Sequence, residues 1–205
     1  MSNIIIQKFG GTSVGSEERI ASVAKIVQKA SLENSIVVVV SAMSGETNRL
    51  INLAKSFGDN PSKREFDALI STGEKVSAAL LAMALQQIGV PAKSFSASQI
   101  SMKTTNTYSK ARILEVDGNK IQETLDAGVV PIITGFQGIT ESGDVTTLGR
   151  GGSDTTAVAI AAQMKAERCD IYTDVDGIYT TDPRIVPKAK KLDTITMEEM
   201  LEMAG

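Results

Sequence analysis

Residues 4–20, IIIQKFGGTSVGSEERI, join a short apolar run to a glycine-rich turn and then to an acidic, helix-like segment. This order predicts a strand that passes through a tight turn directly into a helix. Gly10 and Gly15 have the glycine spacing of a P-loop, but Ser16 stands where that motif needs its lysine. The lysine lies upstream instead, at Lys8, where the strand ends. The segment therefore predicts the first unit of an α/β fold, with the cation supplied by the strand.

The same alternation of strand and helix patterns continues along the chain. The expected strands are residues 4–8, 36–41, 92–96, 129–134 and 169–173. The expected helices are residues 17–33, 47–57, 66–88, 119–127 and 155–166. The runs SIVVVVSA and GVVPIITGF are almost continuously apolar, which is typical of strands covered on both faces. We therefore expect an α/β fold, a three-layer αβα sandwich with a mainly parallel open sheet.

Three further segments depart from this alternation. Residues 100–116 are rich in threonine and β-branched side chains and predict an extra hairpin at one edge. Residues 138–154, GITESGDVTTLGRGGSD, predict a hairpin that leads into a glycine turn. Residues 194–205, TITMEEMLEMAG, have the pattern of an amphipathic helix.

Composition excludes several classes of function. The chain has 205 residues and a formal net charge of -3, which argues against a nucleic-acid platform. It contains no histidine, which excludes Ser-His and Cys-His mechanisms and makes a zinc site improbable. Cys169 is the only cysteine, so an internal disulfide is impossible and a reducing, cytoplasmic location is expected. No uninterrupted apolar run reaches the roughly 18 residues of a membrane span.

Glycine, hydroxyl and charged residues cluster directly after four of the expected strands. The clusters are GGTS after the first strand, SAMSGETN after the second, GFQG after the fourth and TDVDGIYTTDPR after the fifth. In an open parallel sheet, ligands bind beyond the carboxyl ends of the strands. We therefore expect these clusters to meet at one edge of the sheet and to form the site.

Two glycine turns have the composition of anion sites. Gly10 and Gly11 permit close backbone approach, and Lys8 would add a point charge, although an isolated Gly-Gly is also an ordinary tight turn. In TLGRGGSDTTA, Ser153 or Asp154 is a natural N-cap for the next helix. Arg150 lies beside these glycines and is able to hold a carboxylate through two hydrogen bonds. Because a capped helix alone leaves Arg150 and Asp154 unexplained, a ligand role is favoured here.

The remaining polar candidates have alternatives. The spacing in TDVDGIYTTDPR does not fit a calcium loop, so Thr173, Asp174, Tyr179 and Arg184 are expected to line a nucleotide cleft or a polar loop. Glu74 lies at the start of an apolar helix, where it complements the helix dipole or holds a substrate ammonium. Residue Thr47 is either an N-cap or a substrate-binding hydroxyl.

Taken together, KFGGTSV, STGE, GRGGSD and TDVDGIYTTDPR closely resemble the signature motifs of the aspartokinases, in the amino acid kinase family. The resemblance covers essentially the whole chain and implies the amino acid kinase-like (carbamate kinase-like) sandwich. It implies transfer of the γ-phosphoryl group of MgATP to the β-carboxylate of L-aspartate, the first step toward lysine, threonine and methionine. A carboxylate is already a nucleophile, so positioning and charge neutralisation suffice and no histidine base is needed.

The resemblance also implies a role for each candidate residue. Lys8 and Asp154 would be catalytic, with Asp154 orienting the lysine. No residue is assigned as a metal ligand, and Mg²⁺ would act with ATP. The aspartate site would comprise Ser13, Thr47, Glu74, Arg150 and Ser153. The nucleotide site would comprise Lys8, Gly10, Gly11, Thr173, Asp174, Tyr179 and Arg184.

Members of the family usually continue beyond this point, with a segment like GAKVLH that carries a second nucleotide-contacting lysine, and then regulatory ACT domains. The resemblance therefore implies that residues 1–205 are an N-terminal part of the catalytic domain, without ACT domains. It also implies at least a dimer, with no nucleic-acid or membrane partner. Alternatives are a kinase of glutamate, N-acetylglutamate, carbamate or UMP, or a chain that binds nucleotide without turnover.

Overall fold

The centre of the protein is a five-stranded sheet in which every pair of neighbours is parallel. We analysed a computed structural model that describes residues 3–58, 60–174, 177–180, 185–186 and 188–194. The sheet lies within the first of two units, residues 1–173. In spatial order its strands are β3 (Ala92–Phe95), β6 (Val130–Thr134), β2 (Ser35–Val40), β1 (Ile4–Phe9) and β9 (Arg168–Tyr172). The expected mainly parallel sheet is confirmed, with strand ends within one residue of the expected ones.

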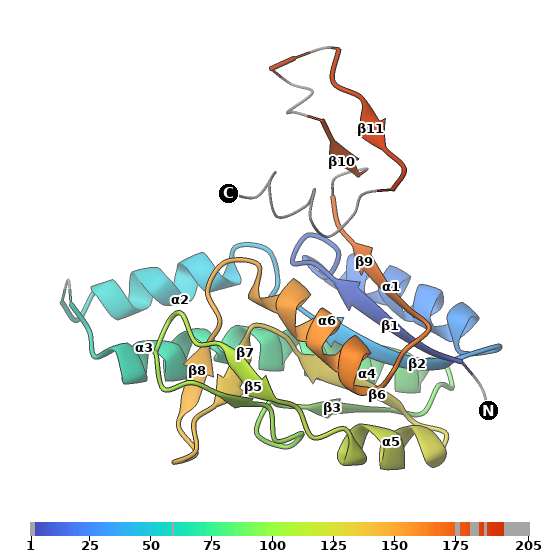
Figure 1. Cartoon of the computed structure of the whole chain (residues 1–205), viewed down its shortest axis with the longest axis horizontal. Coiled ribbons are helices and arrows are strands. Elements are labelled where there is room, and N and C mark those ends of the chain that lie inside the picture. The colour runs from blue at the N-terminus through green and yellow to red at the C-terminus, as the bar shows by residue number, and fades with distance from the viewer. Residues whose placement is uncertain (1–2, 59, 175–176, 181–184, 187, 195–205) are drawn as a thin grey trace. The chain divides into compact units, whose positions relative to one another are not determined.

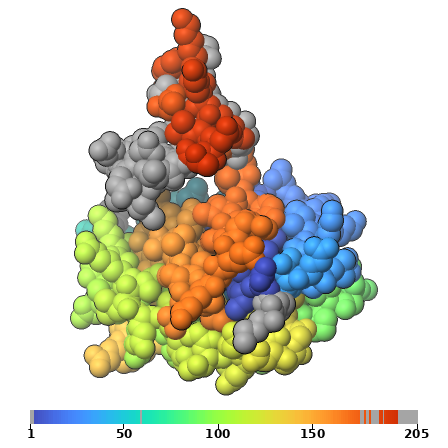
Figure 2. Space-filling view, turned by 45° about the vertical axis from the view of Figure 1, so that its right-hand side comes forward, coloured from blue at the N-terminus to red at the C-terminus, as the bar shows by residue number. Residues whose placement is uncertain are grey.

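Helices cover both faces of this sheet, which gives the expected three layers (Figure 1). Along β2, Ile36, Val38 and Val40 pack into one core, whereas Val37 and Val39 pack into the other. This alternation follows from the strand geometry, in which successive side chains point to opposite faces. The first core is closed by α1 (Glu17–Ala30) and α4 (Thr72–Gln87), and the second by α5 (Asn119–Asp126) and α6 (Gly152–Gln163). Figure 2 shows the outer surface of α6 in orange, above α5 in yellow.

A second, four-stranded sheet lies beside the main sheet and confirms both expected hairpin regions. Its strand order is β5 (Ile113–Glu115), β4 (Lys103–Thr104), β7 (Gln137–Ile139) and β8 (Val145–Thr147). The pairs β4–β5 and β7–β8 are antiparallel, and the β4–β7 pair is parallel. The β7–β8 hairpin matters for the site, because the chain passes from β8 through a short glycine-rich loop into α6.

The expected long helix over residues 66–88 is instead two helices. These are α3 (Lys63–Ile70) and α4, which are separated at Ser71, while α2 (Glu46–Lys55) precedes them. The carbonyl oxygen of Ser71 accepts a hydrogen bond from the buried amide of Gln137 on β7, at 2.9 Å. This tertiary contact fixes the break, and the local apolar pattern does not reveal it.

The α3–α4 stretch, Lys63–Gln87, is long and apolar enough to span a membrane by length and composition alone. Half of its most apolar window is buried within the protein. Its buried residues include two carboxylates, Asp67 and Glu74, and its apolar residues pack against the sheet. These are the features of a core helix.

The second unit, residues 174–205, contains a short antiparallel pair among its described residues. The pair consists of β10 (Ile178–Tyr179) and β11 (Lys191–Leu192). The helix expected over residues 194–205 lies outside the described residues, except for Thr194.

Candidate functional site

A cavity of about 370 Å³ lies at the carboxyl ends of the main-sheet strands. Its wall comes from the ends of β1 and β2, the first turns of α2 and α4, and the loop that enters α6. Phe136, between β6 and β7, completes it. The candidate residues that line it are Lys8, Gly11, Thr47, Glu74, Arg150, Ser153 and Asp154. The structure therefore brings together clusters that lie more than one hundred residues apart in the chain.

Lys8 and Asp154, which both line the cavity, form an ion pair. The distance from Lys8 Nζ to Asp154 Oδ1 is 2.6 Å, and the lysine side chain is only 9% exposed. The lysine is carried by β1, whereas the aspartate lies in the first turn of α6. The ion pair therefore orients a cation that is largely shielded from solvent, and a shielded charge acts more strongly on a bound anion.

Glu74 is the most unusual acidic group of the cavity. It is 3% exposed, and its Oε1 accepts a hydrogen bond from the Ala42 N–H at 3.1 Å. Oε2 is buried and has no hydrogen-bond partner among the described residues. Burial raises the pKa of Glu74 from 4.5 to about 7, although the Ala42 N–H works in the opposite direction. A half-satisfied buried carboxyl facing a cavity is suited to a cationic ligand group.

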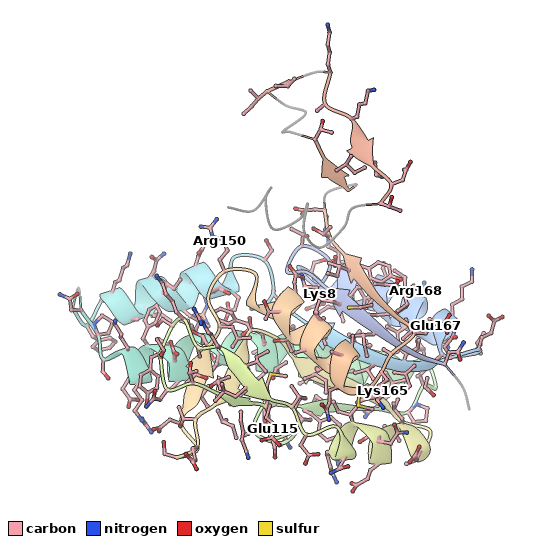
Figure 3. The ribbon with its side chains drawn as sticks, viewed as in Figure 1. Lys8, Glu115, Arg150, Lys165, Glu167 and Arg168 are labelled. Carbon is pink, nitrogen blue, oxygen red and sulfur yellow. The ribbon has the colours of Figure 1, made fainter. Side chains whose placement is uncertain are left out.

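The loop that enters α6 carries Arg150, which is exposed. Figure 3 shows Arg150 on this loop and Lys8 on β1, at the same edge of the sheet.

The expectation that Ser153 or Asp154 caps α6 is wrong. Gly151, with φ of 72°, is the N-cap residue, and no side chain caps the helix. The αL conformation favours glycine at this position and leaves both side chains inside the first helical turn.

Gly10 and Gly11, in the turn after β1, have different surroundings. The Gly10 N–H donates to the Tyr172 carbonyl oxygen at 3.1 Å, so this amide is already occupied within the protein. Gly11 lines the cavity, whereas Gly10 and Ser13 do not. In this conformation the Gly10 N–H is therefore not available to a ligand, whereas Gly11 lies at the wall of the cavity. The expectation for Thr47 as an N-cap is also wrong, since Gly45 caps α2 and Thr47 lies inside it.

We expect Gly11→Ala to destabilise the fold far more than Gly10→Ala. A Cβ on Gly11 would lie 2.8 Å from the Ala42 carbonyl oxygen, whereas one on Gly10 would meet its nearest atom at 3.5 Å. Overpacking against backbone typically costs about 1–3 kcal/mol. Urea unfolding of both variants checks this, and equal midpoints would contradict the close approach of the turn to Ala42.

Among the nucleotide candidates, Lys8 and Gly11 line the cavity. Thr173 and Asp174 are exposed, and Tyr179 lies on β10 in the second unit. Arg184 lies outside the described residues. Their role as nucleotide contacts stays a prediction.

Several cavity residues had no assigned role from sequence. They are Ser41, Ala42, Met43, Ser44, Gly45 and Phe136. Their segments, SAMSGETN and GFQG, were visible as clusters after strands, so the region was predictable. Phe136 adopts a φ of 69°, which is uncommon for a residue other than glycine, and its N–H donates to Thr156 Oγ1 at 3.1 Å.

Known proteins resemble this chain both in sequence and in structure. The aspartate kinase Ask_LysC of Stutzerimonas stutzeri is 60% identical over 98% of this chain and 49% of its own length. The aspartokinase of Pseudomonas aeruginosa is 58% identical over similar shares. The chain thus spans about half the length of the curated relatives that it matches.

Solved structures show the same fold. Aspartate kinase from Synechocystis superposes with a TM-score of 0.84 at 50% identity, over 98% of this chain and 33% of that one. E. coli aspartokinase III, in complex with aspartate and ADP, gives 0.89 at 32% identity, over 98% and 56%. The family model described as "Amino acid kinase family" matches residues 3–205. With this match across the fold and its cavity, the chain belongs to the amino acid kinase family.

Proposed function

We propose that this chain forms the aspartate-binding and phosphoryl-transfer part of an aspartate kinase. The observation that carries the proposal is one cavity that holds the Lys8–Asp154 pair, Arg150 and the half-satisfied carboxyl of Glu74. L-Aspartate offers one ammonium for the buried acid Glu74, one carboxylate for Arg150, and a second carboxylate that would accept the phosphoryl group beside Lys8. The names of relatives at 58–60% identity support the same substrate.

Glu74 and Arg150 would fix the orientation of the amino acid. Glu74 Oε2 would accept from the ammonium group and thereby gain the partner that it lacks in the protein. Arg150 would hold a carboxylate with two hydrogen bonds, which is the preferred geometry for guanidinium. A substrate without an ammonium would leave Glu74 unpaired, and one without a carboxylate would leave Arg150 unpaired, so these two groups select for an amino acid. The second carboxylate of L-aspartate would be needed to accept the phosphoryl group.

Lys8 would neutralise charge that develops on the transferring phosphoryl group. Phosphoryl transfer needs positioned cations and donors more than covalent chemistry from the protein. Asp154 would hold the lysine in place through the 2.6 Å ion pair. The β-carboxylate of aspartate would attack the γ-phosphorus of ATP directly while the bond to the bridging oxygen breaks and ADP leaves, and no proton needs to be removed from the carboxylate at neutral pH.

The ends of two helices add further anion-binding capacity. Both α2 and α6 begin at a glycine in the left-handed conformation, and neither has a side-chain cap. Gly45 and Gly151, the two N-cap residues, both line the cavity. Helix N-termini favour anions because of their free N–H groups and their dipole. They support binding of phosphate or carboxylate oxygens between them.

MgATP would be the phosphoryl donor. A neighbouring structure, E. coli aspartokinase III, contains ADP, which supports nucleotide use. Mg²⁺ usually binds ATP phosphates together with water and one or two carboxylates, so it would enter as part of this substrate. We further propose that residues 1–205 belong to a cytoplasmic catalytic domain that works as at least a dimer, as the aspartokinase resemblance implies.

The test is MgATP-dependent formation of aspartyl hydroxamate, with L-aspartate compared with L-glutamate. Product with L-aspartate alone is the expected result. Product with L-glutamate alone would favour the alternative acidic-amino-acid kinase. Binding of ADP and L-aspartate without product would assign the chain a binding role without turnover.

A further inference from the structure

Asp67 is a fully buried carboxylate outside the cavity, and four hydrogen bonds surround it. Its Oδ2 accepts from the backbone N–H groups of Ser109 and Thr147, both at 2.8 Å. Its Oδ1 accepts from the hydroxyls of the same residues, at 2.8 and 3.0 Å. The carboxylate therefore ties helix α3 to two distant segments, which lie 42 and 80 residues further along the chain. Hydrogen bonds to a charged acceptor are the stronger class, and a buried one is costly to break.

Both segments that Asp67 holds adjoin the Arg150 loop, one along the chain and the other by contact. Thr147 is the last residue of β8, three positions before Arg150. Ser109 adopts a φ of 66°, and a Cβ on Gly149 would lie 3.4 Å from the Ser109 carbonyl oxygen, so the two loops touch. The Ala111 N–H also donates to the Thr147 carbonyl oxygen at 2.9 Å. The exposed Arg150 thus stands on a loop whose base is fixed by a buried charge.

Helix α3 holds the other end of β8 by a different contact. Arg64, one turn before Asp67, forms an ion pair with Asp144, from Nη2 to Oδ1 at 2.7 Å. The Arg64 side chain is 52% exposed, and exposed ion pairs contribute little to stability. The two contacts join one helix to the two ends of one short strand, because Asp144 directly precedes β8 and Thr147 ends it. The Asp67 contact is buried, whereas the Arg64 contact is in solvent. They form a matched pair for experiment.

We propose that Asp67 is a positioning residue, which sets the place of the Arg150 loop and thereby the affinity of the cavity for a dicarboxylic amino acid. The ligand part of this proposal rests on the proposed function. The loop part does not, because it concerns the backbone between Thr147 and Gly152. Asp67 touches no substrate and acts only through the loop.

The test compares Asp67→Asn with Arg64→Gln by two measurements on the whole chain. Hydrogen exchange reports on residues 147–152, and calorimetric titration gives the affinities for L-aspartate and ADP. In Asp67→Asn we expect loop exchange and the aspartate Kd to rise at least tenfold, with ADP affinity within twofold. In Arg64→Gln all three should stay within twofold.

If hydrogen exchange at residues 147–152 is unchanged in folded Asp67→Asn, the proposal is overturned. It is also overturned if the variant loses affinity for L-aspartate and ADP equally and exchanges faster throughout the chain. If Asp67→Asn fails to fold, Thr147→Val and Thr147→Ser decide. Thr147→Val removes one hydroxyl bond and should loosen the loop, whereas Thr147→Ser keeps the hydroxyl and should restore it. If the unmodified chain does not bind L-aspartate, the proposed function fails, and loop exchange still decides the positioning role.

Discussion

Replacing Lys8 with methionine is expected to lower the rate of aspartyl phosphate formation by about 10²–10³-fold, the usual effect of removing one preorganised donor at a developing charge. Methionine retains most of the lysine side-chain volume, so the 9%-exposed site stays filled. Asp154 then loses its partner, and although its side chain is 46% exposed, the Oδ1 atom that pairs with Lys8 is itself buried. The measurement is the hydroxamate rate at saturating L-aspartate and MgATP.

A matched control separates the local charge from the net charge of the protein. Lys75→Met removes a lysine that is exposed and does not line this cavity. Its rate should remain within twofold of the unmodified protein. A Lys8→Met protein that binds ADP and retains full turnover would show that Lys8 does not stabilise the transferring phosphoryl group.

The sequence predicted the main sheet and the edge that carries the cavity because both depend on local patterns. The run SIVVVVSA is apolar at every position from 36 to 40, which is typical of a strand covered on both faces. The clusters after the strands then had to meet, since parallel strands place their carboxyl ends at one edge. The pairing of Lys8 with Asp154 was implied by the resemblance to the aspartokinases and not by the strand pattern, and the two side chains form a 2.6 Å ion pair.

The remaining features depend on contacts between distant residues. Nothing near Asp67 in the sequence indicates that its partners lie 42 and 80 positions away. The break at Ser71 similarly depends on Gln137, which is 66 positions away. The predicted N-cap of α6 was wrong for a different reason. Two adjacent glycines offered a left-handed cap, and this backbone preference prevailed over the side-chain caps of Ser153 and Asp154.

Affinity for L-aspartate is expected to rise with pH between about 5.5 and 7 and to level off above about 7.5. The pKa of Glu74 is raised to about 7 by burial, so the free site is mostly protonated at pH 6 and mostly ionised at pH 8. Only the ionised form pairs with the ammonium, so apparent affinity scales with its fraction, which changes about tenfold between these pH values. The aspartate groups themselves do not titrate in this window. Calorimetry in buffers of different ionisation enthalpy should show about one proton released per aspartate bound at pH 6.

Two controls identify Glu74 as the titrating group. Glu74→Gln should abolish the pH dependence and bind aspartate weakly at all pH values. Glu46→Gln should leave it unchanged, because Glu46 also lies in the first turn of a helix but has a lowered pKa from its hydrogen bond with Arg49. Succinate lacks the ammonium, so above about pH 6.5, where both of its carboxyls are ionised, its affinity should not rise with pH. A succinate profile that matches the aspartate profile would assign the titration to another group.

The same raised pKa predicts a cost in stability in the absence of ligand. Glu74 holds its proton more tightly in the folded chain than in the unfolded chain, so the folded state binds more protons between pH 4.5 and 7. The contribution of Glu74 to the free energy of unfolding therefore falls as pH rises through this window, by up to about 3 kcal/mol. Urea unfolding at pH 5 and pH 8 should show that this loss is absent in Glu74→Gln. Saturating L-aspartate should reduce the loss in the unmodified chain, because the ammonium supplies the partner that burial denies to Oε2. If the Gln variant loses as much stability as the unmodified chain, Glu74 is already ionised in the free site and selects its ligand without a proton exchange.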